Sequence, residues 1–247
     1  MNLWSLEWIR LTRTGRILIL LAVFFSFGII GPLSVRYLPE LLEAAGSSGA
    51  ISSLPPVTPE FAMSSFLGNA LQIGLLAVAF VGAAALAIDA KPEVSVFFRS
   101  RATIPEILAP RFVAISAATV AAFAVGVATA AVTSGILIGW PEAGATIIGS
   151  LLVALYLVFA VALIALFGSL VRKVPATALL TVGTLIVLSL VGLLGAIGPW
   201  LPSYLIGGFD SIIAGGDFVY WRAIVVTVAA IAAALTIAVI RLENREV

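Results

Sequence analysis

The chain has neither cysteine nor histidine among its 247 residues. Without cysteine it can form no disulfide and no thiolate metal site. Without histidine it lacks a common metal ligand and any His-based catalytic triad. It also has no Gly-x-x-x-x-Gly-Lys-Ser/Thr loop, so we do not expect it to bind and hydrolyse ATP by itself. We therefore expect no enzyme activity, no metal and no cofactor in this chain.

Charge is also scarce, because only 10% of the residues are charged and 62% are hydrophobic. The hydrophobic residues form six uncharged runs of 18 or more residues. A helix rises about 1.5 Å per residue and needs roughly 20 residues to cross a hydrocarbon layer about 30 Å thick. Lipid offers no hydrogen-bond partners, so each span must be helical. We predict an all-α, single-domain, polytopic membrane protein with spans over residues 17–35, 66–88, 112–138, 145–171, 174–197 and 223–240.

The thirteen Lys and Arg residues are distributed unevenly between the two sides of such a bundle. Only Arg36 and Arg222 fall on one side, and all the others fall on the side of the two termini. The positive-inside bias then predicts cytoplasmic termini in a cell (plasma or inner) membrane. The net charge of +1 gives no indication of a nucleic-acid partner, so we expect the lipid bilayer, and no nucleic acid, around the chain.

Residues 1–16 carry tryptophans and arginines in two helical stripes. Trp4 and Trp8 share one side of a helix, while Arg10 and Arg13 share another. Both residue types gather at membrane interfaces, so we predict a helix lying in the inner interface before the first span. A plain basic flank is the alternative, and we expect the first span to be retained as a span and not cleaved as a signal peptide.

Three connecting segments are long enough to carry structure of their own. We expect the outer segment 36–65 to be a loop with one short helix over residues 38–45. The inner segment 89–111 mixes charged and apolar residues, so it either lies on the membrane or docks a partner, and we favour docking. The apolar outer segment 199–222 predicts one or two short helices over 203–214 that dip into the outer leaflet. An aromatic belt at the ends of the neighbouring spans is the alternative.

Two amides stand near the outer end of the second span. Asn69 and Gln72 are three residues apart and therefore share one helix face. They are the uncharged amides that we place near a substrate route, although an interhelical hydrogen bond explains them equally well. Small residues recur at every fourth position in the third and sixth spans, where helix packing is the better explanation. These residues are Ala118, Ala122, Gly126, Ala130 and Ser134, followed by Ala230, Ala234 and Ala238.

No charged side chain lies well inside any predicted span. A charge at mid-bilayer costs about 2.5–3.5 kcal/mol on insertion scales, so proteins retain one mainly to relay protons or bind ions. Its absence disfavours an ion-coupled carrier, although sodium-coupled carriers can use neutral ligands. A transporter without its own energy source would need a partner that supplies one.

The order of segments resembles the ABC-2 type permease subunit of ATP-binding-cassette exporters. Such permeases have an interfacial helix, six spans with cytoplasmic termini, an inner loop after the second span and an apolar outer segment before the sixth. Their inner loop commonly begins with acidic and ends with basic residues, as it does here from Asp89 and Glu93 to Arg111. The Gly-Thr element common in that loop is absent, and residues 100–103 occupy its place.

The resemblance implies that residues 91–108 dock in a cleft of a separate ATPase subunit, which binds ATP and Mg. It implies that residues 1–16 are the elbow helix and that 203–214 are outer re-entrant helices. Two permease copies, identical or sister chains, would face each other through the second and fifth spans, with the substrate route between them. The implied coupling residues are Lys91, Glu93, Phe97, Phe98, Arg99, Arg101 and Glu106.

The expected function is thus export of a hydrophobic or amphipathic substrate, driven by ATP hydrolysis in the partner. Two alternatives stay open at the level of sequence. A gradient-driven secondary carrier would transport without ATP, and a membrane scaffold or assembly subunit would hold partners without transporting.

Overall fold

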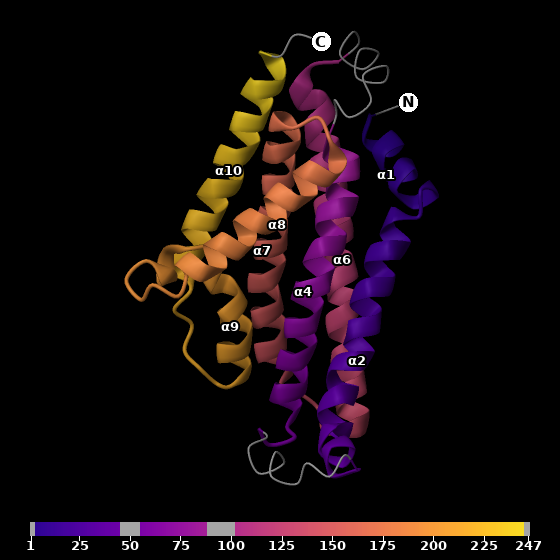
Figure 1. The fold of residues 1–247 in the computed structure, drawn as a ribbon, viewed down its shortest axis with the longest axis vertical. Helices are drawn as coiled ribbons and strands as arrows, with labels where there is room; N and C mark the ends of the chain where they lie inside the picture. Colours follow the sequence, from indigo (N-terminus) through magenta and orange to yellow (C-terminus); the bar gives the residue numbers. More distant parts are fainter. Residues whose placement is uncertain (1–2, 45–54, 88–101, 245–247) are drawn as a thin grey trace.

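A computed structural model describes residues 3–44, 55–87 and 102–244, with only the backbone of Leu41 (Figure 1). All regular secondary structure in these ranges is helical, and six helices are long and apolar enough to cross a membrane. This confirms the prediction of an all-α, multi-pass membrane protein. The six are α2 (Arg16–Ala44), α4 (Pro59–Leu86), α6 (Ile104–Leu137), α7 (Ala143–Leu170), α8 (Val174–Val191) and α10 (Trp221–Glu243).

Three shorter elements complete the described fold. Helix α1 (Leu3–Arg13) precedes the first span, and the 3-10 helix η2 (Gly198–Trp200) and α9 (Tyr204–Ile213) lie between α8 and α10. The start of α1 and the end of α10 lie at the same end of the bundle, at the top of Figure 1. Because six helices, an even number, run along the bundle, the first and last described residues come to the same end.

The first span is longer than predicted. Residues 36–44 continue α2 without a break, so the prediction of a loop there with a separate helix over 38–45 is wrong. The helix runs through Pro32 and Pro39, each of which removes one backbone donor while keeping φ near the helical value. In the last part of α2, Arg36 pairs with Glu40 one turn later at 2.9 Å, an i, i+4 contact that supports a helix.

The inner loop before α6 is shorter than predicted. Helix α6 begins at Ile104, so the expectation of a loop as far as residue 111 is wrong for residues 104–111. The backbone N–H of Thr103 donates to Glu106 Oε2 at 2.8 Å, as in a capping box. Pro105 falls in the first turn, where no backbone donor is needed. Residues 89–101 of the predicted loop lie outside the described residues.

The fifth span is shorter than predicted, because α8 ends at Val191 and not at residue 197. Glycine at 192, 195 and 198 weakens a helix there, and the chain turns back so tightly that a Cβ on Gly198 would lie 2.5 Å from the carbonyl oxygen of Gly192. The Ser203 hydroxyl donates to the carbonyl oxygen of Leu188 at 3.1 Å. This bond ties the entry of α9 to the open end of α8.

Helices α2, α4 and α6 pack through glycines around a fully buried phenylalanine. A Cβ on Gly28 would lie 2.6 Å from the Gly126 carbonyl oxygen, so the backbones of α2 and α6 touch. Phe24 fills the centre and meets Phe123 edge to face at 5.8 Å between ring centroids. The stripe of small residues in the third span is buried at all five positions from Ala118 to Ser134, which confirms packing as its role.

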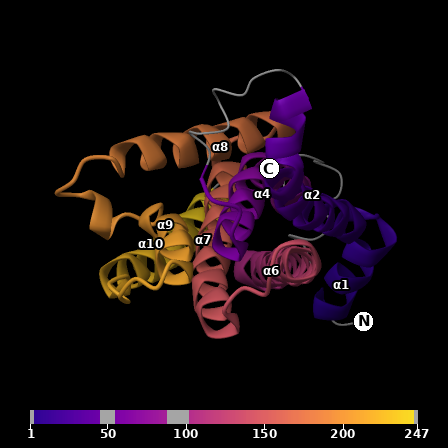
Figure 2. The same cartoon turned by 90° about the horizontal axis from the view of Figure 1, so that it is seen from below.

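Helix α7 is the central element of the other half of the bundle. It contacts α4, α6, α8, α9 and α10, and the view along the bundle in Figure 2 shows α8 crossing the outside of α4 and α7. Helix α9 packs on α7 through close backbone approach, since a Cβ on Gly149 would lie 3.0 Å from Cα of Phe209. The single helix α9 agrees with the prediction of a short helix over 203–214.

Candidate functional site

A groove of about 530 Å³ opens between α4 and α8, and we call it the α4–α8 groove. Helix α7 contributes one aromatic side chain to it, and α9 closes one end with Ile206. No residue that lines it is charged, and nearly all of its surface is apolar. Its lining residues are Leu71, Gln72, Leu75, Leu76, Tyr156, Val182, Leu185, Ile186, Ser189, Leu190 and Ile206.

Three polar side chains give this groove its specific chemistry. The Gln72 amide projects from an exposed position on α4, and Tyr156 on α7 and Ser189 on α8 each bring a hydroxyl to the lining. A mainly apolar pocket with a few polar groups is the usual form of a small-molecule site. Asn69, predicted to accompany Gln72, is half-buried and does not line the groove.

A second groove, of about 470 Å³, lies between α6 and α7. It also has polar side chains, Thr146 and Ser150, but their hydroxyls donate to the carbonyl oxygens of Glu142 and Thr146 at 2.8 and 2.6 Å. Because these bonds stay within α7, this groove offers little specific polar recognition. The α4–α8 groove is therefore the stronger candidate for binding a solute.

Helix α9 closes one end of the α4–α8 groove with Ile206. A Cβ on Gly208 would lie 2.6 Å from Leu152 Cδ1 of α7, which shows how closely the two helices fit. Helix α9 also contacts α4, so it touches two of the helices that line the groove. Any movement of α9 would change the end of the groove that Ile206 closes.

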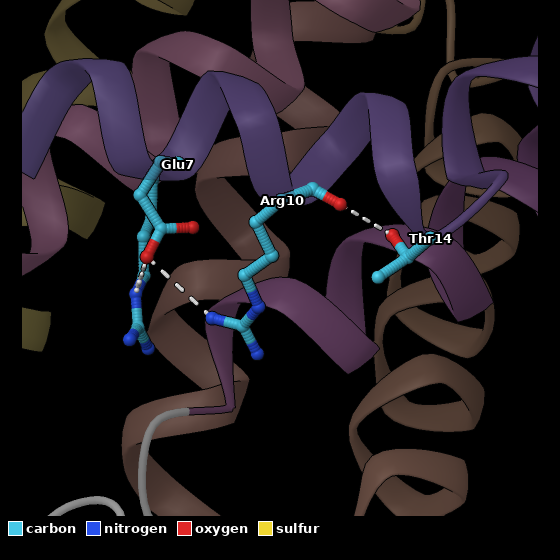
Figure 3. A network of polar contacts seen from close by, with 4 residues as sticks. Glu7, Arg10 and Thr14 are labelled. Atoms are coloured by element: carbon cyan, nitrogen blue, oxygen red, sulfur yellow. Dashed lines mark hydrogen bonds and ion pairs between the residues drawn. The ribbon is translucent and has the colours of Figure 1, made fainter.

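The opposite end of the molecule carries a buried ion pair between α1 and α6 (Figure 3). Arg111 Nε donates to Glu7 Oε1 at 2.9 Å, and both side chains are almost completely buried. Arg10 Nη1 lies 3.5 Å from the same carboxylate oxygen. One carboxylate therefore holds two guanidinium groups, and this network joins α1 to the beginning of α6.

The faces of α1 are arranged as an interfacial helix would require. Glu7 and Leu11 are buried against the bundle, whereas Trp4 and Trp8 are each 51% exposed. The helix thus turns an acidic side chain inward and its tryptophans outward, and Arg13 is also exposed. After Arg13 the chain turns at Gly15, whose φ of 68° is the left-handed conformation that favours glycine.

Of the predicted coupling residues, only Glu106 lies within the described residues. Its carboxylate accepts from the backbone N–H of Thr103 and thereby fixes the start of α6. The other six, Lys91, Glu93, Phe97, Phe98, Arg99 and Arg101, lie outside the described residues. In sequence they precede α6, which begins seven residues before the buried Arg111.

Sequence reasoning did not find the pairing of Glu7 with Arg111, or the place of Tyr156 and Ser189 in the groove. Glu7 and Arg111 are 104 positions apart, and the sequence analysis put one in an interfacial helix and the other at the end of an inner loop. The available signal was that Glu7 is the only acidic residue in the first sixteen, among three arginines. Tyr156 is the only tyrosine in the six predicted spans, which marked it as a position that requires a polar partner.

Comparison with family models, with curated proteins and with solved structures gives no match. Among the described residues, no group of three acidic side chains lies close enough to hold a metal ion. The fold and the groove define the class, a multi-pass helical membrane protein with an uncharged groove between spans.

Proposed function

We propose that this chain is the permease subunit of an ATP-binding-cassette exporter of the ABC-2 type, and that it moves a hydrophobic or amphipathic substrate. ATP hydrolysis belongs to a separate subunit that binds at the end of the bundle where both termini lie. The α4–α8 groove carries the proposal, because it is uncharged, lies between membrane-spanning helices and includes an amide and two hydroxyls.

The position of α9 supports this assignment. Gly149, which α9 contacts, lies about 9 Å along α7 from Ala143, at 1.5 Å per residue. Leu71, which shares the groove with Ile206, lies about 18 Å along α4 from Pro59. Helix α9 therefore lies beside α7 in the half of the bundle opposite the termini (Figure 1), where an outer gate would lie.

The Glu7–Arg111 network supports the second half of the proposal, which is mechanical coupling. A partner that pushes on the loop before α6 would move the start of α6. The buried ion pair would then carry α1 with it. Two discrete arrangements of the bundle, shifted by a partner that binds one of them more tightly, are sufficient for alternating access. A second copy of the chain, or a sister chain, would complete the route opposite the α4–α8 groove.

Co-purification from native membranes tests the proposal. The tagged full chain should carry a subunit with vanadate-sensitive ATPase activity, and Arg99→Glu with Arg101→Glu should remove both that subunit and the activity. The control reverses two basic residues at the other connection on the same side, Arg172→Glu with Lys173→Glu, between α7 and α8. This control variant should keep most of the associated ATPase.

Two results would overturn the proposal. One is purified chain that carries no ATPase yet moves a lipophilic cationic dye across liposomes along an imposed ion gradient, which identifies a secondary carrier. The other is an ATPase partner whose activity is unaffected when dye is added and which moves no dye, because a scaffold gives that result.

A further inference from the structure

Arg222 is held between two tryptophans at the start of α10. Its guanidinium carbon lies 5.2 Å from the ring centroid of Trp200 and 5.3 Å from that of Trp221, within the range of cation–π contact. The two indoles come from η2 and α10, on either side of the α9 segment. All three side chains remain exposed, so the guanidinium is oriented by the indoles while its N–H groups remain accessible.

Within the described residues, Arg222 forms no ion pair, and its nearest acidic neighbours in sequence, Asp210 and Asp217, do not pair with it. Arg36, the other basic residue predicted on this side, differs in this respect. It also lies over an aromatic ring, that of Tyr37 at 5.4 Å, but Glu40 accepts from its Nη1 at 2.9 Å. Of these two arginines, only Arg222 lacks a carboxylate partner.

The residues around Arg222 are of the kinds that gather at a membrane interface. The apolar stretch of α10 begins at the next residue, Ala223, and Phe218 and Val219 just before it are each 54% exposed. Tryptophan is enriched where the hydrocarbon layer meets the headgroups, with its ring in the apolar layer and its N–H in the polar one. A guanidinium at such an interface that lacks a carboxylate can bind an anion from its surroundings.

We propose that Arg222, clamped between Trp200 and Trp221, binds the phosphate of an anionic phospholipid headgroup in the leaflet opposite the termini. A guanidinium presents a fork of N–H donors that matches two phosphate oxygens, and the two neighbouring indoles restrict the orientation of that fork in advance. The bound lipid would hold η2 and the start of α10 together, on both sides of α9. This inference requires only that the chain spans a membrane, and it does not depend on the proposed export function.

Native mass spectrometry of the purified full chain tests the site with phosphatidylglycerol and phosphatidylcholine at equal concentrations. Wild type should retain phosphatidylglycerol preferentially. Arg222→Gln should lower its retention about fivefold, the expected value of one basic residue at an anionic lipid surface. Arg36→Gln, the matched control, should stay within about twofold of wild type. Arg222→Lys keeps the charge but loses the fork of N–H donors. Its retention of phosphatidylglycerol should therefore lie between that of wild type and that of Arg222→Gln.

A melting curve for each variant shows whether it folds, and Arg222→Lys serves as the test if Arg222→Gln does not. The inference is overturned if folded Arg222→Gln, or in its place folded Arg222→Lys, retains phosphatidylglycerol as wild type does. Equal loss in Arg36→Gln would show a general charge effect and would also overturn it. So would displacement of the lipid by millimolar glycerol 3-phosphate, because the site would then be one for a soluble phosphate.

Discussion

At the scale of single residues, two carboxylate–guanidinium pairs of equal length differ greatly in burial. Glu7–Arg111 and Glu40–Arg36 both measure 2.9 Å, but the side chains of the first pair are 7% and 4% exposed and those of the second are 57% and 42% exposed. Exposed pairs contribute little because water screens them. A buried pair makes the loss of one partner costly, because the other charge remains out of water.

The first prediction concerns the buried pair. Glu7→Gln should lower the thermal stability of the purified chain and expose α1 to protease. Arg111 would keep its charge but lose the Glu7 carboxylate, and breaking a buried pair in this way typically costs about 3 kcal/mol. The double variant Glu7→Gln with Arg111→Gln should lose less than the sum of the two single variants, because neither charge is then left alone. Melting curves in detergent and limited proteolysis of the N-terminal helix measure both effects.

The control for this prediction is the exposed pair. Arg36→Gln and Glu40→Gln should each change stability by less than about 0.5 kcal/mol, with no coupling between them. If Glu7→Gln also falls in that range, then the Glu7–Arg111 pair does not hold α1 on α6.

At the scale of helices, backbone contact through glycine sets how the first half of the bundle packs. Gly28 and Gly126 bring α2 against α6, and Gly31 brings α2 so near α4 that a Cβ there would lie 2.6 Å from Cα of Phe66. Small residues allow such approach in membranes, where close van der Waals packing replaces the hydrophobic effect between helices. Because the atom facing each of these positions belongs to the backbone, rotation of a side chain cannot relieve an added methyl group.

The second prediction is that Gly28→Ala destabilises the bundle by about 1–3 kcal/mol, as overpacking usually does. Gly68→Ala on α4 is the matched control, because a Cβ there meets nothing within 4 Å. Alanine favours a helix over glycine by roughly 0.5–1 kcal/mol, so the control should be neutral or slightly more stable. Melting temperatures of the two purified variants decide the matter. Equal values would show that α2 and α6 can separate without loss.

The sequence predicted which segments are helical better than where those helices end. Uncharged runs identified all six spans, because only helix satisfies the backbone in lipid. The ends depended on local contacts that composition does not reveal: α2 runs through Pro32 and Pro39, and α6 starts early at the Thr103–Glu106 capping box. In the groove, Gln72 was predicted, whereas Tyr156 and Ser189 come together only through the packing of α7 against α8.

At the scale of the whole molecule, the chain leaves one side of its groove open. Helix α8 is packed on α4 and α7, yet Leu179, Val187 and Leu190 on its outer side are each more than half exposed. Exposure alone does not identify an interface between copies, because lipid could cover these side chains. Ile136 on α6 is 73% exposed as well. What distinguishes the α8 face is that the α4–α8 groove, with its amide and hydroxyls, opens beside it. In the proposed permease, a second copy covers this face and the groove together.

The third prediction uses the absence of cysteine from the chain, since any introduced thiol is then the only one. Val187→Cys should form a disulfide-linked dimer when native membranes are treated with copper phenanthroline, because two copies facing through α8 bring equivalent residues together. A disulfide requires Cα atoms about 4.4–6.8 Å apart, so the reaction reports direct contact. Ile136→Cys, at least as exposed but on α6, should stay monomeric on a non-reducing gel. Equal cross-linking of both variants would indicate random collision in the membrane. Cross-linking of Ile136→Cys alone would place the partner on the α6 side, away from the proposed route.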